Sequence, residues 1–213
     1  RGLGSSATLS VGGVLAANAL NGNLLKPDEC LALAVELEGH PDNAAPAMLV
    51  GMRASFMEDG KPVTAEVPIG ENIGFIAMIP NFETKTSDMR RALPECVPMG
   101  DAIFNLSRVA VLIRAMETCD LNLIAHAMTD RLHQPYREKL IDDCDRARRA
   151  AMESGAAAFC ISGSGSTCLA VADGENAETI AEGIRKKLAD SPYGWRVLHL
   201  NPDRCGAQVE ELR

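Results

Sequence analysis

The first residues that could do chemistry form a short loop rich in glycine and serine. Gly2, Gly4, Ser5 and Ser6 come just before an apolar stretch that is typical of a helix. Unpaired backbone N–H groups at a helix start attract phosphate, and glycine lets the phosphate come close. No Lys follows, so the loop differs from the P-loop, and its spacing differs from that of dinucleotide folds. The pattern indicates a phosphate loop, although a flexible lead-in to a helix could have the same residues.

A second polar cluster occupies residues 36–43 and combines three carboxylates, an imidazole and an amide around a turn. Two acids so close together could hold Mg²⁺, and His40, Asp42 and Asn43 could hold a small polar substrate. A solvated helix end, in which Asp42 caps the next helix, explains the same residues equally well. The cluster by itself therefore leaves both interpretations open.

The elements around these residues are predicted from apolar periodicity and from turn chemistry. The first helix, rich in Ala, Leu and Val, is expected to be largely buried. A domain boundary is expected near Pro68–Gly70, and the order of elements after it suggests a split βαβ sandwich. The predicted helices cover residues 7–21, 27–37, 99–118, 121–128 and 135–154, with one more over 177–188, and the predicted strands cover residues 48–57, 63–67, 73–79, 157–161, 167–171 and 195–200.

Composition narrows the class of protein. The chain has 213 residues, of which 46% are hydrophobic and 23% charged, which is enough to build a core. A net charge of -8 without a block of Lys and Arg argues against nucleic acid, and no apolar run is long enough for a membrane helix. The seven Cys are odd in number and form no C-x-x-C pair, so we expect reduced core thiols in a cytoplasmic protein.

Several strings together resemble the superfamily of galactokinase, homoserine kinase, mevalonate kinase and phosphomevalonate kinase. The three signature regions are matched, in order and spacing, by GLGSSA at the start, EGHPDNAAPAMLVG in the middle and SGSGST near the end. The middle string resembles homoserine kinase in particular. So do three further strings: KTS with Arg90 before ALP, FNLSR from Phe104, and DRLHQPYR from Asp130. The resemblance covers nearly the whole chain. It departs at Ser166, where the family usually has Pro, which loosens the turn but removes no chemical group.

The resemblance implies an α+β, two-domain small-molecule kinase fold. Residues 1–70 would be the remainder of an N-terminal domain like ribosomal protein S5 domain 2, and residues 71–213 a ferredoxin-like split βαβ domain. The chain opens on the phosphate loop without Met and without a strand before it, so we expect that the family's N-terminal part is missing from this sequence, either because the chain is a fragment or because its start was not determined. That part would supply much of the adenine pocket.

The same resemblance assigns the site residues. ATP and Mg²⁺ are the implied cofactors, with Ser6 and Glu38 contacting the metal. L-homoserine is the implied substrate, with Asn43, Thr86 and Arg90 at the reaction centre. The ATP phosphates would lie against Arg1, Gly2, Leu3, Gly4, Ser5, Ser6 and Ala7, and the amino acid would be held by His40, Asp42, Arg90 and Arg137.

The implied roles of the two arginines agree with their chemistry, because a planar guanidinium grips a carboxylate well. Arg90 could instead be a charge on a helix surface, and Arg137 a solvated residue after Pro135. The residues 162–167 could likewise be only a tight hairpin between two strands. In the resembled family they lie against the phosphate loop.

Two other functions compete with homoserine phosphorylation. One is a kinase of the same superfamily that acts on another small molecule, such as mevalonate or a sugar. The other is a binding or sensing relative without catalysis, which the presence of Ser6 and Glu38 argues against. No nucleic-acid or membrane partner is expected, and a homodimer is left open.

Overall fold

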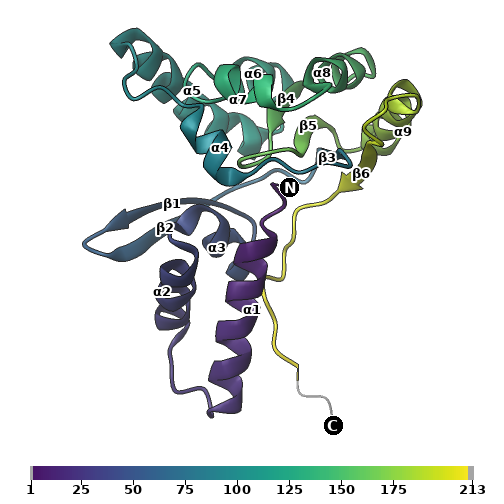
Figure 1. Ribbon diagram of the computed structural model, residues 1–213. Helices are drawn as coiled ribbons and strands as arrows, with labels where there is room; N and C mark the ends of the chain where they lie inside the picture. The colour runs from purple at the N-terminus through teal and green to yellow at the C-terminus, as the bar shows by residue number, and fades with distance from the viewer. Residues whose placement is uncertain (1, 211–213) are drawn as a thin grey trace. The chain divides into compact units, whose positions relative to one another are not determined.

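A computed structural model describes residues 2–210 of the chain. It contains two compact units (Figure 1). The first unit is Gly4–Pro68 with the residues that follow Asn201, and the second is Ile69–Asn201 with the start of the chain up to Leu3. The assignment of kinase domains to residues 1–70 and 71–213 stays a prediction.

The first unit is built from three helices and a hairpin. α1 (Ser5–Leu20) and α2 (Pro27–Glu38) pack with α3 (Pro41–Met48), and β1 (Met52–Glu58) pairs antiparallel with β2 (Lys61–Val67). α2 begins where the sequence favours it, with Pro27 in its first turn and Glu29 accepting a hydrogen bond from the backbone N–H of Lys26 at 2.7 Å. The bend at residues 39–40 then turns the chain into α3.

The prediction that the first helix is largely buried is wrong. α1 buries only Ala7, Val11 and Val14, while Leu9 and Leu20 are 78% and 89% exposed in the chain. The three buried positions lie on one stripe of a helix, and that stripe contacts the core formed with α2 and α3. The sequence offered α3 only within the alternative in which Asp42 caps a following helix, and the structure contains that helix.

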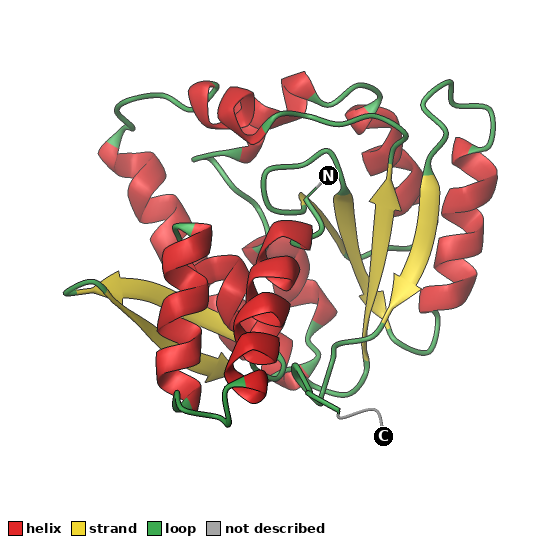
Figure 2. Cartoon of the chain, turned by 60° about the horizontal axis from the view of Figure 1, so that its bottom comes forward, coloured by secondary structure: helices red, strands yellow, loops and turns green. Residues whose placement is uncertain are grey.

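The second unit contains a four-stranded antiparallel sheet with the order β4-β5-β3-β6. Its strands are β3 (Ile73–Ile79), β4 (Ala158–Ile161), β5 (Cys168–Asp173) and β6 (Arg196–Leu200). β3 lies at the centre, with Phe75 opposite Val171 on one side and Leu200 on the other. The expected split βαβ arrangement is thus confirmed, and Figure 2 shows these strands beside their helices.

Helices α8 (Cys144–Glu153) and α9 (Ala177–Leu188) pack on the sheet and form one apolar core with it. The remaining helices of this unit are α4 (Thr86–Arg91), α5 (Met99–Thr118), α6 (Leu121–Ala127) and α7 (Gln134–Arg137), and η1 (Glu138–Leu140) is a 3-10 turn. They connect β3 to α8.

The single helix predicted over residues 135–154 is wrong. The chain forms α7 and η1, leaves the helical path at Ile141, and resumes as α8 after Asp143. Ile141 is extended and only 3% exposed, and Asp143 has a positive φ of 61°. Burial of the Ile141 side chain in the core thus overrides the helical periodicity of the sequence.

Candidate active site

The predicted phosphate loop is divided between the two units. In the second unit, the Ser162 hydroxyl donates to the carbonyl oxygen of Gly2 at 2.6 Å. A Cβ on Gly2 would lie 2.2 Å from the carbonyl oxygen of Ser162, and the φ of Gly2 is +71°, so this position requires glycine. The residues 162–167 therefore lie against the start of the loop, whereas Arg1 lies outside the described residues.

In the first unit, the loop leads into α1 through Gly4, which has a positive φ of 67°. No side chain caps α1, and its first turn contains no acid. The first N–H groups of a helix have no partner within the helix, and they lie at the positive end of its dipole. The N-terminal turn of α1, which contains Ser5, Ser6 and Ala7, thus has the chemistry of an anion site.

The two predicted metal ligands are neighbours. Ser6 Oγ donates to Glu38 Oε2 at 2.9 Å, and Ser10 Oγ lies 3.5 Å from the same oxygen. Magnesium is commonly held by one or two carboxylates, with phosphate and water oxygens completing its shell. One carboxylate and a hydroxyl beside a phosphate loop fit that pattern. Among residues 2–210 there is no group of three or more His, Cys, Asp or Glu that could hold a metal by itself.

The other polar residues of the cluster gather at the start of α3. Asp42 Oδ1 lies 2.5 Å from Nδ1 of His40, the residue that precedes the helix. Asn43 points its Oδ1 to within 3.9 Å of where a Gly4 Cβ would be, so its amide is close to the phosphate loop. Asp42 accepts no capping bond from α3. The structure thus differs from the alternative in which Asp42 only caps a helix.

Arg90 and Arg137 are brought together in the second unit, from the last turn of α4 and the end of α7. The pKa of Arg137 is lowered, first by burial and then by the positive charge of Arg90. Arg137 Nε donates to the Met89 carbonyl at 3.2 Å, and Nη1 donates to the Gly163 carbonyl at 3.4 Å. Two guanidinium groups that repel each other favour an anion, because its charge relieves the repulsion.

Thr86 begins α4 and lies close to the loop of residues 162–167. Its Oγ1 is 3.4 Å from Oγ of Ser164, and the buried Met89 packs under Gly165. Ser166, which replaces the usual Pro of the resembled family, donates to the Phe82 carbonyl at 2.8 Å. The serine therefore ties the loop to the segment before α4.

Sequence reasoning assigned no role to Asn105 and Asp130, although both lie in strings that it quoted. The two side chains share a hydrogen bond of 2.5 Å, and Asp130 also accepts from two backbone N–H groups at the start of α7. The pKa of Asp130 is lowered, since these hydrogen bonds outweigh the burial that would raise it. The sequence did contain a signal for this role of Asp130: it lies a few residues before the helix that ends at Arg137, an implied substrate ligand.

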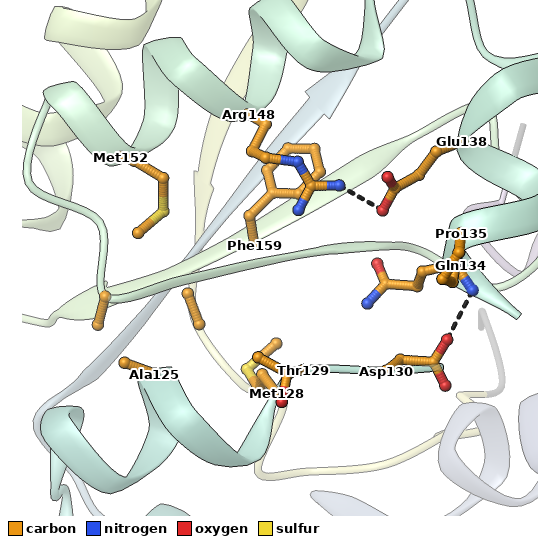
Figure 3. A pocket seen from close by; sticks show the side chains of 12 residues that line it. Ala125, Met128, Thr129, Asp130, Gln134, Pro135, Glu138, Arg148, Met152 and Phe159 are labelled. Carbon is orange, nitrogen blue, oxygen red and sulfur yellow. Dashed lines mark hydrogen bonds and ion pairs between the residues drawn. The ribbon is translucent and has the colours of Figure 1, made fainter. Parts of the chain in front are cut away.

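A pocket of about 410 Å³ lies beside this network in the second unit (Figure 3). An ion pair between Arg148 and Glu138 crosses it, and Arg148 stacks on Phe159 with 4.6 Å to the ring centroid. The pocket contains none of the predicted site residues. It is lined by Ala125, Met128, Thr129, Asp130, Gln134, Pro135, Glu138, Arg148, Met152, Ala157, Ala158 and Phe159.

The seven cysteines form no disulfide. Cys30, Cys144 and Cys168 are buried, but Cys96 and Cys205 are exposed, so the expectation that all are core thiols is wrong. Among the described residues, none of the helices combines the length and the apolar character that crossing a membrane requires.

Comparison with known proteins places this geometry in a class. Residues 1–51 match the family model of the GHMP kinases N terminal domain, and residues 112–190 match that of the GHMP kinases C terminal. GHMP kinases are the superfamily resembled by the sequence strings, and the chain is an ATP-dependent small-molecule kinase of this class.

Within this class the chain belongs to the homoserine kinase family. It is 39% identical to a homoserine kinase of Clostridium botulinum, over 97% of this chain and 69% of that protein. A homoserine kinase of Thermosynechococcus vestitus is 45% identical over 89% of this chain and 63% of its own length. The crystal structure of homoserine kinase from Cytophaga hutchinsonii superimposes with a TM-score of 0.88 at 30% identity, covering 96% of this chain and 67% of that one.

Proposed function

We propose that the protein containing this chain transfers the γ-phosphoryl group of ATP to the hydroxyl of L-homoserine, in threonine biosynthesis. Family membership supports the reaction, because the relatives reported above are homoserine kinases. The observation that carries the choice of substrate is the pair Arg90 and Arg137: Arg137 is held by the Met89 and Gly163 carbonyl oxygens, and its pKa is lowered first by burial and then by the charge of Arg90. The pair fits a carboxylate, and together with Asp42 and His40, which suit an ammonium group, it favours an amino acid over an acid such as mevalonate.

The phosphate loop and the start of α1 would bind the triphosphate. We assign the phosphates to the loop that ends at Ala7, where the backbone N–H groups of α1 can donate to their oxygens. Ser6 and Glu38, which already share a hydrogen bond, would hold the metal. Magnesium supplies charge neutralisation at the phosphate oxygens when it is bound.

The substrate hydroxyl needs orientation more than it needs a strong base. Little negative charge builds on the attacking oxygen in the loose transition state of phosphoryl transfer, so the proton can pass to the phosphate itself. In this proposal Asn43 and Thr86 orient the reacting groups, and Arg90 neutralises charge beside them. His40 and Asp42 would bind the ammonium end of the amino acid.

We propose a cytoplasmic location, and the cysteine content of the chain supports it. Its seven cysteines are free, including Cys144 and Cys168, whose sulfur atoms lie 3.9 Å apart without a bond. An odd number of cysteines without a C-x-x-C pair is typical of proteins of a reducing compartment.

A coupled assay of ADP release tests the reaction. We expect turnover with L-homoserine and little with mevalonate or galactose. 3-Aminopropan-1-ol is homoserine without its carboxylate, so it reports on the arginine pair alone. ATP binding without turnover of any of these compounds would reject the kinase in favour of a binding relative, and equal turnover of mevalonate would reject the amino-acid substrate.

A further inference from the structure

Two sequence strings that have no role in the proposed reaction form one polar network in the second unit. They are the segment from Phe104 to Arg108 on α5 and the segment from Asp130 to the start of α7. We propose that Asp130 and Asn105 are a positioning pair, which fixes α7 and thereby the place of Arg137. This inference rests on the proposed function, because it gives Arg137 the role of a carboxylate ligand.

Each oxygen of the Asp130 carboxylate accepts at least one hydrogen bond. Oδ1 accepts from Asn105 Nδ2 at 2.5 Å, and Oδ2 accepts from the backbone N–H groups of His133 at 2.8 Å and Gln134 at 2.6 Å. The Asp130 side chain is only 9% exposed. Asn105 completes the arrangement, since its Oδ1 accepts from the backbone N–H of Arg131 at 3.0 Å. The side-chain amide of Asn105 thus orients the Asp130 carboxylate and also holds the backbone at Arg131.

α7 needs these contacts because it has only four residues. A helix of one turn is unstable without tertiary contacts. Its second attachment is the buried side chain of Gln134, whose Oε1 accepts from the backbone N–H of Ile161 at 2.9 Å. In Figure 3, Asp130 and Gln134 lie on the wall of the pocket, joined by the hydrogen bond at the helix start. Arg137 is the last residue of the same turn, so the network sets its position.

The other end of the network is held by aromatic contacts. Arg108 and Arg131 both lie over the ring of Phe104, with 3.2 Å and 3.8 Å from the guanidinium carbon to the ring centroid. Arg108 also donates to the carbonyl oxygen of Phe104 at 3.2 Å. These contacts join the segment at residue 131 to α5 and keep Asn105 facing Asp130.

The arrangement distinguishes a carboxylate from an amide at position 130. Three donors converge on the Asp130 side chain, and a carboxylate can accept from all of them. An amide in the same place would present its own donor to the amide donor of Asn105. Exchanging the two residues restores the pattern, because an amide at position 130 can accept from the two backbone N–H groups and donate to a carboxylate at position 105. That carboxylate can still accept from the backbone N–H of Arg131.

The experiment compares Asp130→Asn, Asn105→Asp and the double exchange in the full-length protein. For Asp130→Asn we expect the KM for homoserine to rise about 10-fold and the KM for ATP to stay within about twofold. Asn105→Asp should be worse, because two carboxylates then face each other. The double exchange should return the KM for homoserine to within about threefold of the wild type. Single and double variants with the same KM for homoserine would overturn the pairing.

Two further measurements separate positioning from general stability. Asp120→Ala is the stability control, because it removes the cap of α6, where Asp120 accepts from the Leu123 N–H at 3.0 Å, and it should lower the melting temperature without changing the KM for homoserine. In an Arg137→Ala background, Asp130→Asn should raise that KM no further. An additional rise of the same size would show that Asp130 does not act through Arg137 and would overturn the proposal.

Amide hydrogen exchange makes the test independent of activity. Asp130→Asn should speed amide hydrogen exchange in the segment 133–137. The double variant, in which residues 105 and 130 are swapped, should slow it again. Unchanged exchange would overturn the inference even in an active enzyme. A wild type that does not phosphorylate homoserine, but shows this exchange pattern, would refute the proposed function and leave the network as a support for α7 alone.

Discussion

The polar residues of the first unit pair with each other at helix ends, whereas Arg137 of the second unit is held by backbone carbonyl groups of two other segments. In the first unit Ser6 pairs with Glu38 between two helix ends, and His40 pairs with Asp42 two residues away. In the second unit Arg137 donates to Met89 and to Gly163. Binding a phosphate requires only a suitable helix start, but aiming a guanidinium requires a tertiary scaffold.

The charges of the two regions also differ in sign. Glu38 and Asp42 make the cluster of the first unit acidic, which suits a metal ion and an ammonium group. Arg90 and Arg137 make the second unit's cluster basic, which suits a carboxylate. The four predictions below test whether the two regions serve these separate parts of the reaction.

The largest effect is expected from the arginine pair. Changing Arg90 or Arg137 to Ala should raise the KM for homoserine far more than the KM for ATP. Loss of a charge-assisted contact in a partly dry site costs on the order of 2 to 4 kcal/mol, or roughly 30-fold to 1,000-fold in kcat/KM. Steady-state kinetics with each substrate varied in turn measures this.

Two controls sharpen the arginine prediction. Lys at either position should rescue only part of the activity, because an ammonium supplies charge without the planar fork. The Ala variants should lose little further with 3-aminopropan-1-ol, which has no carboxylate to grip. If the Ala variants lower kcat/KM for that compound as much as for homoserine, the pair is not a carboxylate clamp.

On the other side of the comparison, Glu38→Gln should lower kcat by roughly a hundredfold, because the loss of a metal ligand removes transition-state charge stabilisation. Single-turnover and steady-state rates at saturating Mg²⁺ measure the effect. Glu36→Gln is the matched control, since Glu36 is an exposed carboxylate on the same helix. Near-wild-type turnover of Glu38→Gln would remove Glu38 from the metal site.

A smaller effect is expected from Ser6→Ala, about tenfold in turnover, with a higher requirement for Mg²⁺. The fold should be unaffected, because Ser6 is exposed. Thr8→Ala removes a hydroxyl from the same turn that bonds the Gly4 carbonyl instead of Glu38, so it should leave the Mg²⁺ requirement unchanged. Parallel losses of melting temperature and activity in Ser6→Ala would mark the hydroxyl as structural.

The smallest effect concerns stability and pH. The pKa of Asp130 is lowered from 3.8, so its contribution to the free energy of unfolding is present above that value and is lost as the pH falls through the lower, folded-state pKa. Asp130→Asn should therefore lower the melting temperature by roughly 2 to 4 °C at pH 7, the shift that about 1 kcal/mol produces. The difference between wild type and variant should shrink toward pH 3. A constant difference across this range would show that the charge of Asp130 does not stabilise the fold.

Much of the secondary structure follows from local patterns. The strand Ile73–Ile79 and the helices Met99–Thr118 and Ala177–Leu188 have the bounds that periodicity predicts. The failure over residues 135–154 has a physical cause, because burial of Ile141 bends a chain whose local preference is helical. The same kind of contact explains α7, which exists through Asp130 and Gln134 instead of through its own propensity.

The sequence by itself determined the chemistry that depends on neighbours along the chain. A glycine-rich start before a helix, acids around a turn and several linked strings were enough to indicate the phosphate loop and the kinase superfamily. The resemblance already implied that Arg90 and Arg137 hold the same amino acid, but only the tertiary structure joined Asn105 to Asp130. Asn105 and Asp130 are far apart in sequence, and the packing of the second unit decides whether they meet. Local propensity carries no information about contacts between residues so far apart.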